Sequence, residues 1–69
     1  MAIQSIQLKA ARVNADLTQK EVAKKLKISP NSIVSYESYT SKPTVDLAEK
    51  FAKLYGVKVD DIIWSLEKK

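Results

Sequence analysis

The feature that most constrains the fold of this chain is a pair of complete helix start signals close together in the sequence. Thr18 is followed three residues later by Glu21, which is the spacing of a capping box. Ser29 is followed by Pro30, and proline fits the first position of a helix because its missing N–H has no helical partner there. The sequence therefore predicts two short helices, one after each cap, joined by a tight turn.

Apolar residues support both helix starts. Leu17 and Val22 are spaced as a hydrophobic staple around the first cap, and Ile28 and Ile33 are spaced in the same way around the second. The first of these helices is expected to continue through Leu26. Two such helices in succession form a helix-turn-helix, which we expect at about residues 18–38.

Three further helices are predicted around this pair, so that the expected fold is all-α with five helices in one domain, residues 1–69. The first covers about residues 3–14, with Leu8 and Ala11 facing the core. Another begins after the cap Thr44 and ends at Gly56. A short last helix covers about residues 60–67, and its buried side is expected to hold Val59, Ile62, Ile63 and Leu66.

Composition makes an enzyme improbable. The chain has no histidine, the commonest general base, and no cysteine, so that thiolate metal sites and disulfides are excluded. We therefore expect no catalytic residues, metal or cofactor. The apolar runs are too short for a membrane span and no secretory signal is visible, which predicts a soluble, cytoplasmic protein.

The net charge of +4 lies entirely in residues 1–42, because the remainder of the chain has equal numbers of basic and acidic residues. A solvated lysine surface is one explanation of such an excess. The other is a basic face that meets phosphate groups.

An ordered set of residues over about positions 5–64 resembles the Cro/CI family, also called lambda-repressor-like or XRE, of helix-turn-helix DNA-binding proteins. The set is Leu8, Arg12, Leu17-Thr18-Gln19, Val22-Ala23, Leu26, Ile28-Ser29, Ile33, Tyr36-Glu37, Lys42-Pro43-Thr44, Tyr55-Gly56-Val57, Val59, Asp60, Ile62 and Ile63. The resemblance implies that the helix beginning near Pro30 lies in the major groove of operator DNA. It also implies that Gln19 meets a phosphate and that Arg12 and Glu37 form a partly buried ion pair. Arg12 is alternatively a phosphate contact, and the two roles are compatible.

The helical period divides the recognition helix into two sides. Ile33, Tyr36 and Glu37 fall on the side expected to face the core, whereas the opposite side and its margin hold the expected base contacts, Asn31, Ser32, Val34 and Ser35. Asparagine can pair with adenine and valine can touch a thymine methyl, and no arginine is present to bind guanine, which favours A·T-rich operator positions. The other reading is a plain solvated helix face.

Phosphate contacts are expected from Gln19, Lys20, Ser38, Thr40 and Lys42, with Lys27 and Tyr39 as further candidates. Lys24 and Lys25 are expected to be solvated. Lys27 and Tyr39 also depart from the family pattern, because relatives usually have glycine at both positions. A left-handed conformation of either residue costs roughly 1–2 kcal/mol, so these turns are expected to differ in detail.

Trp64 is expected opposite the buried side of the last helix, where it is a candidate contact in a homodimer. The alternative is that Trp64 folds back over Ile3 or Ile6. There is a physical reason to expect a dimer, because two copies related by a two-fold axis bind two half-sites about 34 Å apart. The expected function is therefore that of a transcriptional regulator, most simply a repressor that occupies operator DNA, with no small-molecule effector. The alternative is a protein-interaction adaptor or antitoxin-type module that retains the fold.

Overall fold

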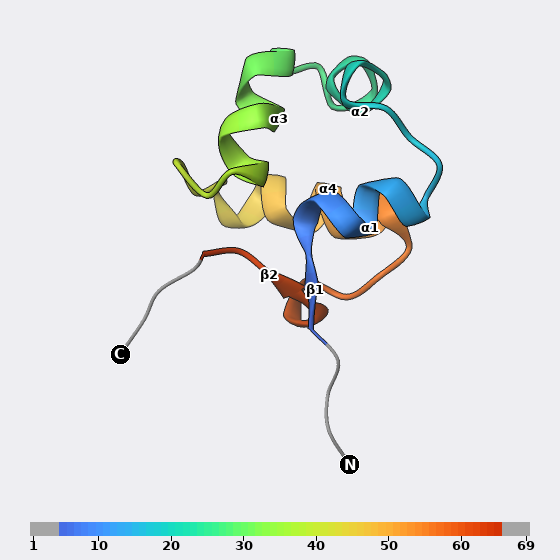
Figure 1. Cartoon of the computed structure of the whole chain (residues 1–69), viewed down its shortest axis with the longest axis vertical. Helices are drawn as coiled ribbons and strands as arrows, with labels where there is room; N and C mark the ends of the chain where they lie inside the picture. Colours follow the sequence, from blue (N-terminus) through green and yellow to red (C-terminus); the bar gives the residue numbers. More distant parts are fainter. Residues whose placement is uncertain (1–4, 66–69) are drawn as a thin grey trace.

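The computed structural model describes residues 5–65 and shows a mostly helical arrangement of four α-helices and one pair of very short strands within that range (Figure 1). The elements in chain order are β1 (Ile6–Gln7), α1 (Leu8–Asn14), α2 (Gln19–Leu26), α3 (Pro30–Glu37), α4 (Val45–Tyr55), the 3₁₀ turn η1 (Val59–Asp61) and β2 (Ile62–Ile63). No helix among the described residues is both long and apolar enough to cross a membrane.

The helix starts predicted from the sequence are confirmed. Glu21 N–H donates to Thr18 Oγ1 at 3.1 Å, and Thr18 N–H donates to Glu21 Oε1 at 2.8 Å, which completes the capping box of α2. The Ser29 hydroxyl caps α3 by accepting from Asn31 N–H at 3.1 Å, and Thr44 caps α4 by accepting from Leu47 N–H at 3.2 Å.

The four α-helices of the described range also end alike. After each helix a residue has a positive φ, and the next N–H bonds to a carbonyl five residues back, which is a Schellman motif. The left-handed residues are Asp16 (φ 61°), Lys27 (φ 60°), Tyr39 (φ 63°) and Gly56 (φ 72°). The corresponding bonds are Leu17 N–H to Arg12 O, Ile28 N–H to Ala23 O, Thr40 N–H to Ser35 O and Val57 N–H to Ala52 O. Both turns that lack the family's glycine therefore keep the left-handed geometry.

The core lies where the four helices meet and is closed by β2. Its most deeply buried large side chains are Phe51, Leu8, Ile33 and Val22, each less than 2% exposed. Phe51 is the central aromatic residue: its ring lies 5.8 Å from that of Tyr36, 5.9 Å from that of Tyr55 and 6.2 Å from that of Trp64, between centroids. One ring of α4 thus connects α3 with the segment after β2.

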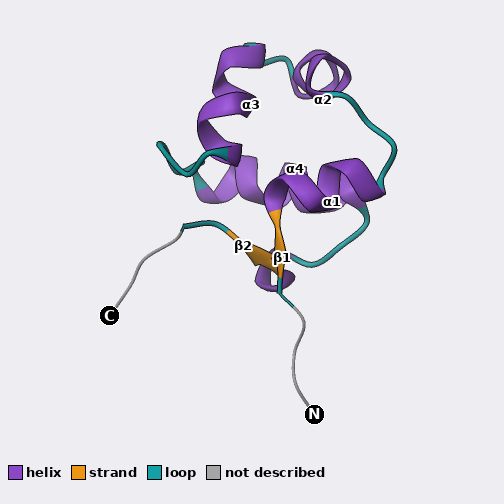
Figure 2. Cartoon of the chain, viewed as in Figure 1, coloured by secondary structure: helices purple, strands orange, loops and turns teal. Residues whose placement is uncertain are grey.

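The prediction for the first helix is wrong at its start, because α1 begins at Leu8 and residues 6–7 are extended. Ile6 and Gln7 pair in parallel with Ile62 and Ile63, in that register, and Figure 2 shows this strand pair beside the helices. The helical period of the apolar residues did not reveal the strand, since two residues are too few to show an alternation. Residues 3 and 4 lie outside the described range.

The prediction of a fifth helix at 60–67 is also wrong within the described range. A single 3₁₀ turn, Val59–Asp61, is followed by the extended residues of β2. Ile62 and Ile63 are β-branched and suit an extended backbone, and pairing with β1 satisfies backbone groups that a helix would have used. Ile62 is buried as predicted (5% exposed), whereas Leu66 lies outside the described residues.

Candidate nucleic-acid interface

The helices α2 and α3 form the predicted helix-turn-helix, with residues 27–29 as the turn. The left-handed Lys27 reverses the chain, and Ile28 N–H bonds back to Ala23 O at 3.0 Å. In Figure 1, α2 is seen nearly end-on and α3 lies to its left and runs down the view, with both helices on the far side of the molecule from the strand pair. Val22 and Ala23 of α2 and Ile33 of α3 are all buried, and this packing fixes the direction in which the outer side of α3 points.

A network of charged and polar side chains connects α3 to α1 and α2. Arg12 and Glu37 form an ion pair (Nε to Oε2, 2.5 Å), with side chains only 10% and 5% exposed. Arg12 also donates to Leu17 O at 2.8 Å, and Gln19 Nε2 donates to Glu37 Oε1 at 3.0 Å. Because the ion pair joins α1 to α3 and Gln19 begins α2, the network holds three helices in one orientation.

Tyr55 of α4 lies behind this network. Its side chain is 7% exposed, and its hydroxyl has no hydrogen-bond partner within residues 5–65. Burial raises the pKa of the Tyr55 hydroxyl far above its ordinary value of 10.0, and the negative charge of Glu37 raises this pKa further.

The outer side of α3 presents small polar side chains. Asn31 and Ser38 are exposed and Val34 is 46% exposed, whereas Ser32 and Ser35 are half-buried. Ile33 is fully buried on the opposite side. The division of α3 expected from the helical period therefore matches the burial of Asn31, Val34 and Ile33, whereas Ser32, Ser35 and Tyr36 are all half-buried.

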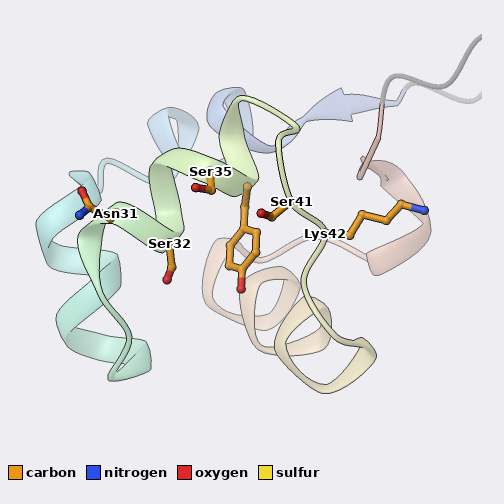
Figure 3. A pocket seen from close by; sticks show the side chains of 6 residues that line it. Asn31, Ser32, Ser35, Ser41 and Lys42 are labelled. Atoms are coloured by element: carbon orange, nitrogen blue, oxygen red, sulfur yellow. The ribbon is translucent and has the colours of Figure 1, made fainter.

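A hollow of about 410 Å³ lies between α3 and the loop that follows it (Figure 3). Its lining consists of Asn31, Ser32, Ser35, Tyr36, Ser41 and Lys42. Three of the four expected base contacts thus line the same hollow as Lys42, an expected phosphate contact. Val34 is not part of the lining.

Sequence reasoning missed two of these lining residues, Tyr36 and Ser41. Tyr36 follows Ser32 by one helical turn, and this spacing was a usable signal that the two share a side of α3. Ser41 had no such signal, because its position depends on the path of the loop. Ser35 O accepts from both Thr40 N–H (2.9 Å) and Ser41 N–H (3.3 Å), which turns the loop back toward α3.

The expected phosphate contacts differ in their freedom to move. Lys20 and Lys42 are exposed. The amide of Gln19 is held by Glu37, and the Ser38 hydroxyl is bonded to Thr40 Oγ1 at 2.9 Å and to Ser35 O at 3.2 Å. The exposed lysines can therefore adjust to an anion, whereas these three polar side chains are fixed by the protein. The Tyr39 hydroxyl accepts from Leu8 N–H at 3.4 Å, at the start of α1.

Trp64 follows β2 and is half-buried against the core, so the expectation that it lies opposite the buried side is wrong. That expectation assumed a helix, and residue 64 is not helical. Its indole N–H donates to Val59 O at 3.0 Å, and its ring faces Phe51 of α4. It lines a second, mostly apolar hollow of about 250 Å³ together with Lys42, Pro43, Val45, Ala48 and Val59. The partner of its ring is thus in α4. Ile3, one of the expected partners, lies outside the described residues.

No group of three or more acidic, histidine or cysteine side chains that could hold a metal ion occurs within residues 5–65. The chemistry of this surface is that of small hydroxyls, one amide and lysine ammonium groups, which suit base edges and phosphate oxygens.

Comparison with known proteins shows which family the chain belongs to. The helix-turn-helix family model matches residues 8–62. The chain is 36% identical over 59 residues to the cryptic phage CTXphi transcriptional repressor RstR of Vibrio cholerae, an alignment that covers 86% of this chain and 53% of that protein. It is 44% identical over 55 residues to an HTH-type transcriptional regulator of Methanocaldococcus jannaschii (80% and 83% covered).

A third relative is the HTH-type transcriptional regulator ImmR of Bacillus subtilis, 41% identical over 56 residues, with 81% of this chain and 44% of ImmR covered. The chain thus spans about half the length of RstR and less than half of ImmR. The matched region contains α1 to α4, the turn between α2 and α3, and the Arg12–Glu37 pair. This chain therefore belongs to the helix-turn-helix family, in its Cro/CI (XRE) type.

Proposed function

We propose that this chain is a DNA-binding transcriptional regulator, most simply a repressor that blocks promoter access by occupying operator DNA. The observation that carries the proposal is the outer surface of α3, which presents small polar side chains beside the exposed Lys42. The names of its relatives support the same function, since all three are transcriptional regulators and one is a phage repressor.

In this proposal α3 lies in the major groove and its outer side reads base edges. Asn31 pairs with an adenine through its N6 and N7, and Val34 contacts a thymine methyl. Ser32 and Ser35 bond to several base edges and discriminate weakly. The operator positions that α3 reads therefore favour A·T pairs.

Lys20 and Lys42 would bind the DNA backbone on the two sides of α3, because they lie at the start of α2 and in the loop after α3. Gln19, Ser38 and Thr40 add neutral phosphate contacts whose positions the protein fixes. Such contacts set the register of α3 on the duplex without reading sequence themselves.

A second copy of the chain is the proposed occupant of the apolar hollow at Trp64. Val45 in this hollow is 74% exposed, and Pro43 and Ala48 beside it are apolar. Because Lys42 lines both this hollow and the one beside α3, a partner seated here would lie next to the DNA-facing surface. A homodimer of this kind would double the few base contacts of one short helix.

We further propose that residues 1–69 act as one DNA-binding unit in the cytoplasm, without catalytic activity, cofactor or effector. The burial of residues from α1 through β2 in one core supports the single unit.

The experiment that tests DNA binding is titration of a mixed-sequence duplex at several salt concentrations. Each phosphate contact contributes about −0.9 to the slope of log affinity against log salt. Lys42→Gln is therefore expected to reduce the magnitude of the slope by about 0.9. Lys53→Gln is the matched control, because Lys53 is an exposed lysine on α4 that lies near Asp46 and Glu49. Undetectable binding at low salt contradicts the proposed function.

Base reading is tested with Asn31→Ala on an operator selected from a random duplex library. The expected loss is about 1–3 kcal/mol on the selected site and little on mixed-sequence DNA. Equal losses on both duplexes mean that Asn31 does not read a base.

A further inference from the structure

Tyr36 contacts both the hydrophobic core and the hollow beside α3. Its ring packs against that of Phe51 in a T-shaped arrangement, with centroids 5.8 Å apart and planes at 84°, and the same residue lines the hollow beside α3. Aromatic residues on the inner side of a helix usually serve packing alone. A tyrosine that is only half-buried has a second property, since its hydroxyl remains available to a ligand.

The Tyr36 hydroxyl is both accessible and unpaired within the described residues. No hydrogen bond of residues 5–65 involves it, and the only buried side-chain oxygen or nitrogen without a partner in that range belongs to Tyr55. The Tyr36 hydroxyl is therefore in contact with solvent. Because the ring is fixed against Phe51, the position of this hydroxyl is defined far better than that of a lysine ammonium group.

The chemistry of the hollow suits an anion. Its lining residues carry four hydroxyls, on Ser32, Ser35, Tyr36 and Ser41. Asn31 and Lys42 also line it, although Figure 3 shows both side chains pointing away from its centre. Because Lys42 is exposed, its ammonium group can turn toward a ligand in the hollow. No carboxylate is part of the lining. Glu37, the acidic residue next to Tyr36, is turned inward and neutralised by Arg12. Hydroxyl and ammonium donors without a competing carboxylate are groups that bind phosphate oxygens.

We infer that the hollow binds one phosphate of the DNA backbone, held by the Tyr36 hydroxyl together with Ser41 and Lys42. This inference rests on the proposed function and adds two residues, Tyr36 and Ser41, to its DNA contacts. Tyr36 then supplies the rigid part of the contact and Lys42 the charged part. The phosphate is thereby positioned by a residue whose ring is anchored in the protein core.

The test compares wild-type chain with Tyr36→Phe on a mixed-sequence duplex of about 20 base pairs. Phenylalanine keeps the ring on Phe51 and removes only the hydroxyl, so that the thermal unfolding midpoint should not fall. The expected result is about a tenfold weaker affinity with an unchanged salt slope, because the lost donor is neutral. Tyr55→Phe is the matched control, since it removes a hydroxyl that is buried away from this hollow, and its affinity should equal that of wild type.

Two further measurements identify the ligand. If Tyr36 and Lys42 hold the same phosphate, Tyr36→Phe should cost less in a Lys42→Gln background than alone, whereas independent contacts would add. Ser41→Ala should also weaken binding, by a smaller factor.

The outcomes separate this inference from the proposed function. DNA binding by wild type with no loss in Tyr36→Phe overturns the inference and leaves the function in place. Additive losses with Lys42→Gln also overturn it. An absence of wild-type binding at low salt overturns both.

Discussion

Replacing Lys27 with glycine should stabilise the fold. Lys27 has φ 60° and ψ 45°, and a residue with a Cβ in this conformation costs roughly 1–2 kcal/mol. Glycine removes that cost, but it lowers the free energy of unfolding by about 0.5–1 kcal/mol because it is more flexible in the unfolded chain. The Lys27 side chain is exposed and makes no hydrogen bond within residues 5–65, so that little else is lost. The net gain for Lys27→Gly is about 0.5–1 kcal/mol.

Thermal and urea unfolding measure this gain. For a domain of 60–100 residues, 1 kcal/mol corresponds to roughly 4–8 °C in Tm, so that an increase of about 2–8 °C is expected. Lys27→Ala is the matched control, because it removes the same charge and keeps the Cβ. Its stability should lie within about 0.5 kcal/mol of wild type.

Gly56→Ala provides the reverse experiment. Gly56 has φ 72°, and a Cβ at this position would meet no atom within 4 Å. Any loss of stability in Gly56→Ala therefore reports the left-handed conformation and no clash, and about 1 kcal/mol is expected. A Lys27→Gly variant no more stable than Lys27→Ala would refute the assignment of strain to this turn.

The remaining predictions concern the buried Arg12–Glu37 network, the buried hydroxyl of Tyr55 and the cap of α2. Glu37→Gln should destabilise the fold by about 3 kcal/mol in urea unfolding, since it leaves the Arg12 guanidinium buried without its counter-charge, whereas the double variant Arg12→Met/Glu37→Leu should be nearly neutral. Above pH 10 the unfolded chain loses the Tyr55 proton, whereas the folded chain keeps it because folding raises the pKa of Tyr55. The free energy of unfolding should therefore fall with pH more steeply in wild type than in Tyr55→Phe, by about 1.4 kcal/mol per pH unit. Equal alkaline slopes for the two proteins would contradict this coupling. Thr18→Ala should cost about 1 kcal/mol in thermal unfolding by removing the capping box, and a neutral effect would show that the Glu21 bond alone secures the helix start.

Local signals in the sequence were sufficient for the helix-turn-helix. The caps at Thr18, Ser29 and Thr44 act on backbone groups within three residues, so their effect can be read from neighbouring letters. The side-chain division of α3 was also local, because one period determines which residues share a side.

The two short strands, β1 and β2, could not be predicted from local signals, because each is extended only through pairing with the other. Ile6 pairs with Ile62, and neither segment alone favours a strand over a helix. The apolar spacing of Val59, Ile62 and Ile63 fits one face of a helix, and the prediction of a fifth helix followed from that spacing. A distant backbone partner decided in favour of the extended form.

The hollow beside α3 was missed because it is made by a left-handed residue whose side chain does not favour that conformation. Tyr39 reverses the chain, which allows the N–H groups of Thr40 and Ser41 to bond to the same oxygen, Ser35 O. This reversal brings Ser41 and Lys42 beside Ser32 and Tyr36.

Glycine would make the same turn without strain, so the presence of tyrosine needs a compensating contact. The hydrogen bond from Leu8 N–H to the Tyr39 hydroxyl provides one, since Gln7 supplies no side-chain cap at the start of α1. The bond also joins the end of α3 to the start of α1. Backbone strain at Tyr39 is therefore located where it shapes the proposed DNA-binding surface, whereas the strain at Lys27 has no such contact to offset it. This difference is the reason why glycine is expected to stabilise the chain at position 27 more than at position 39.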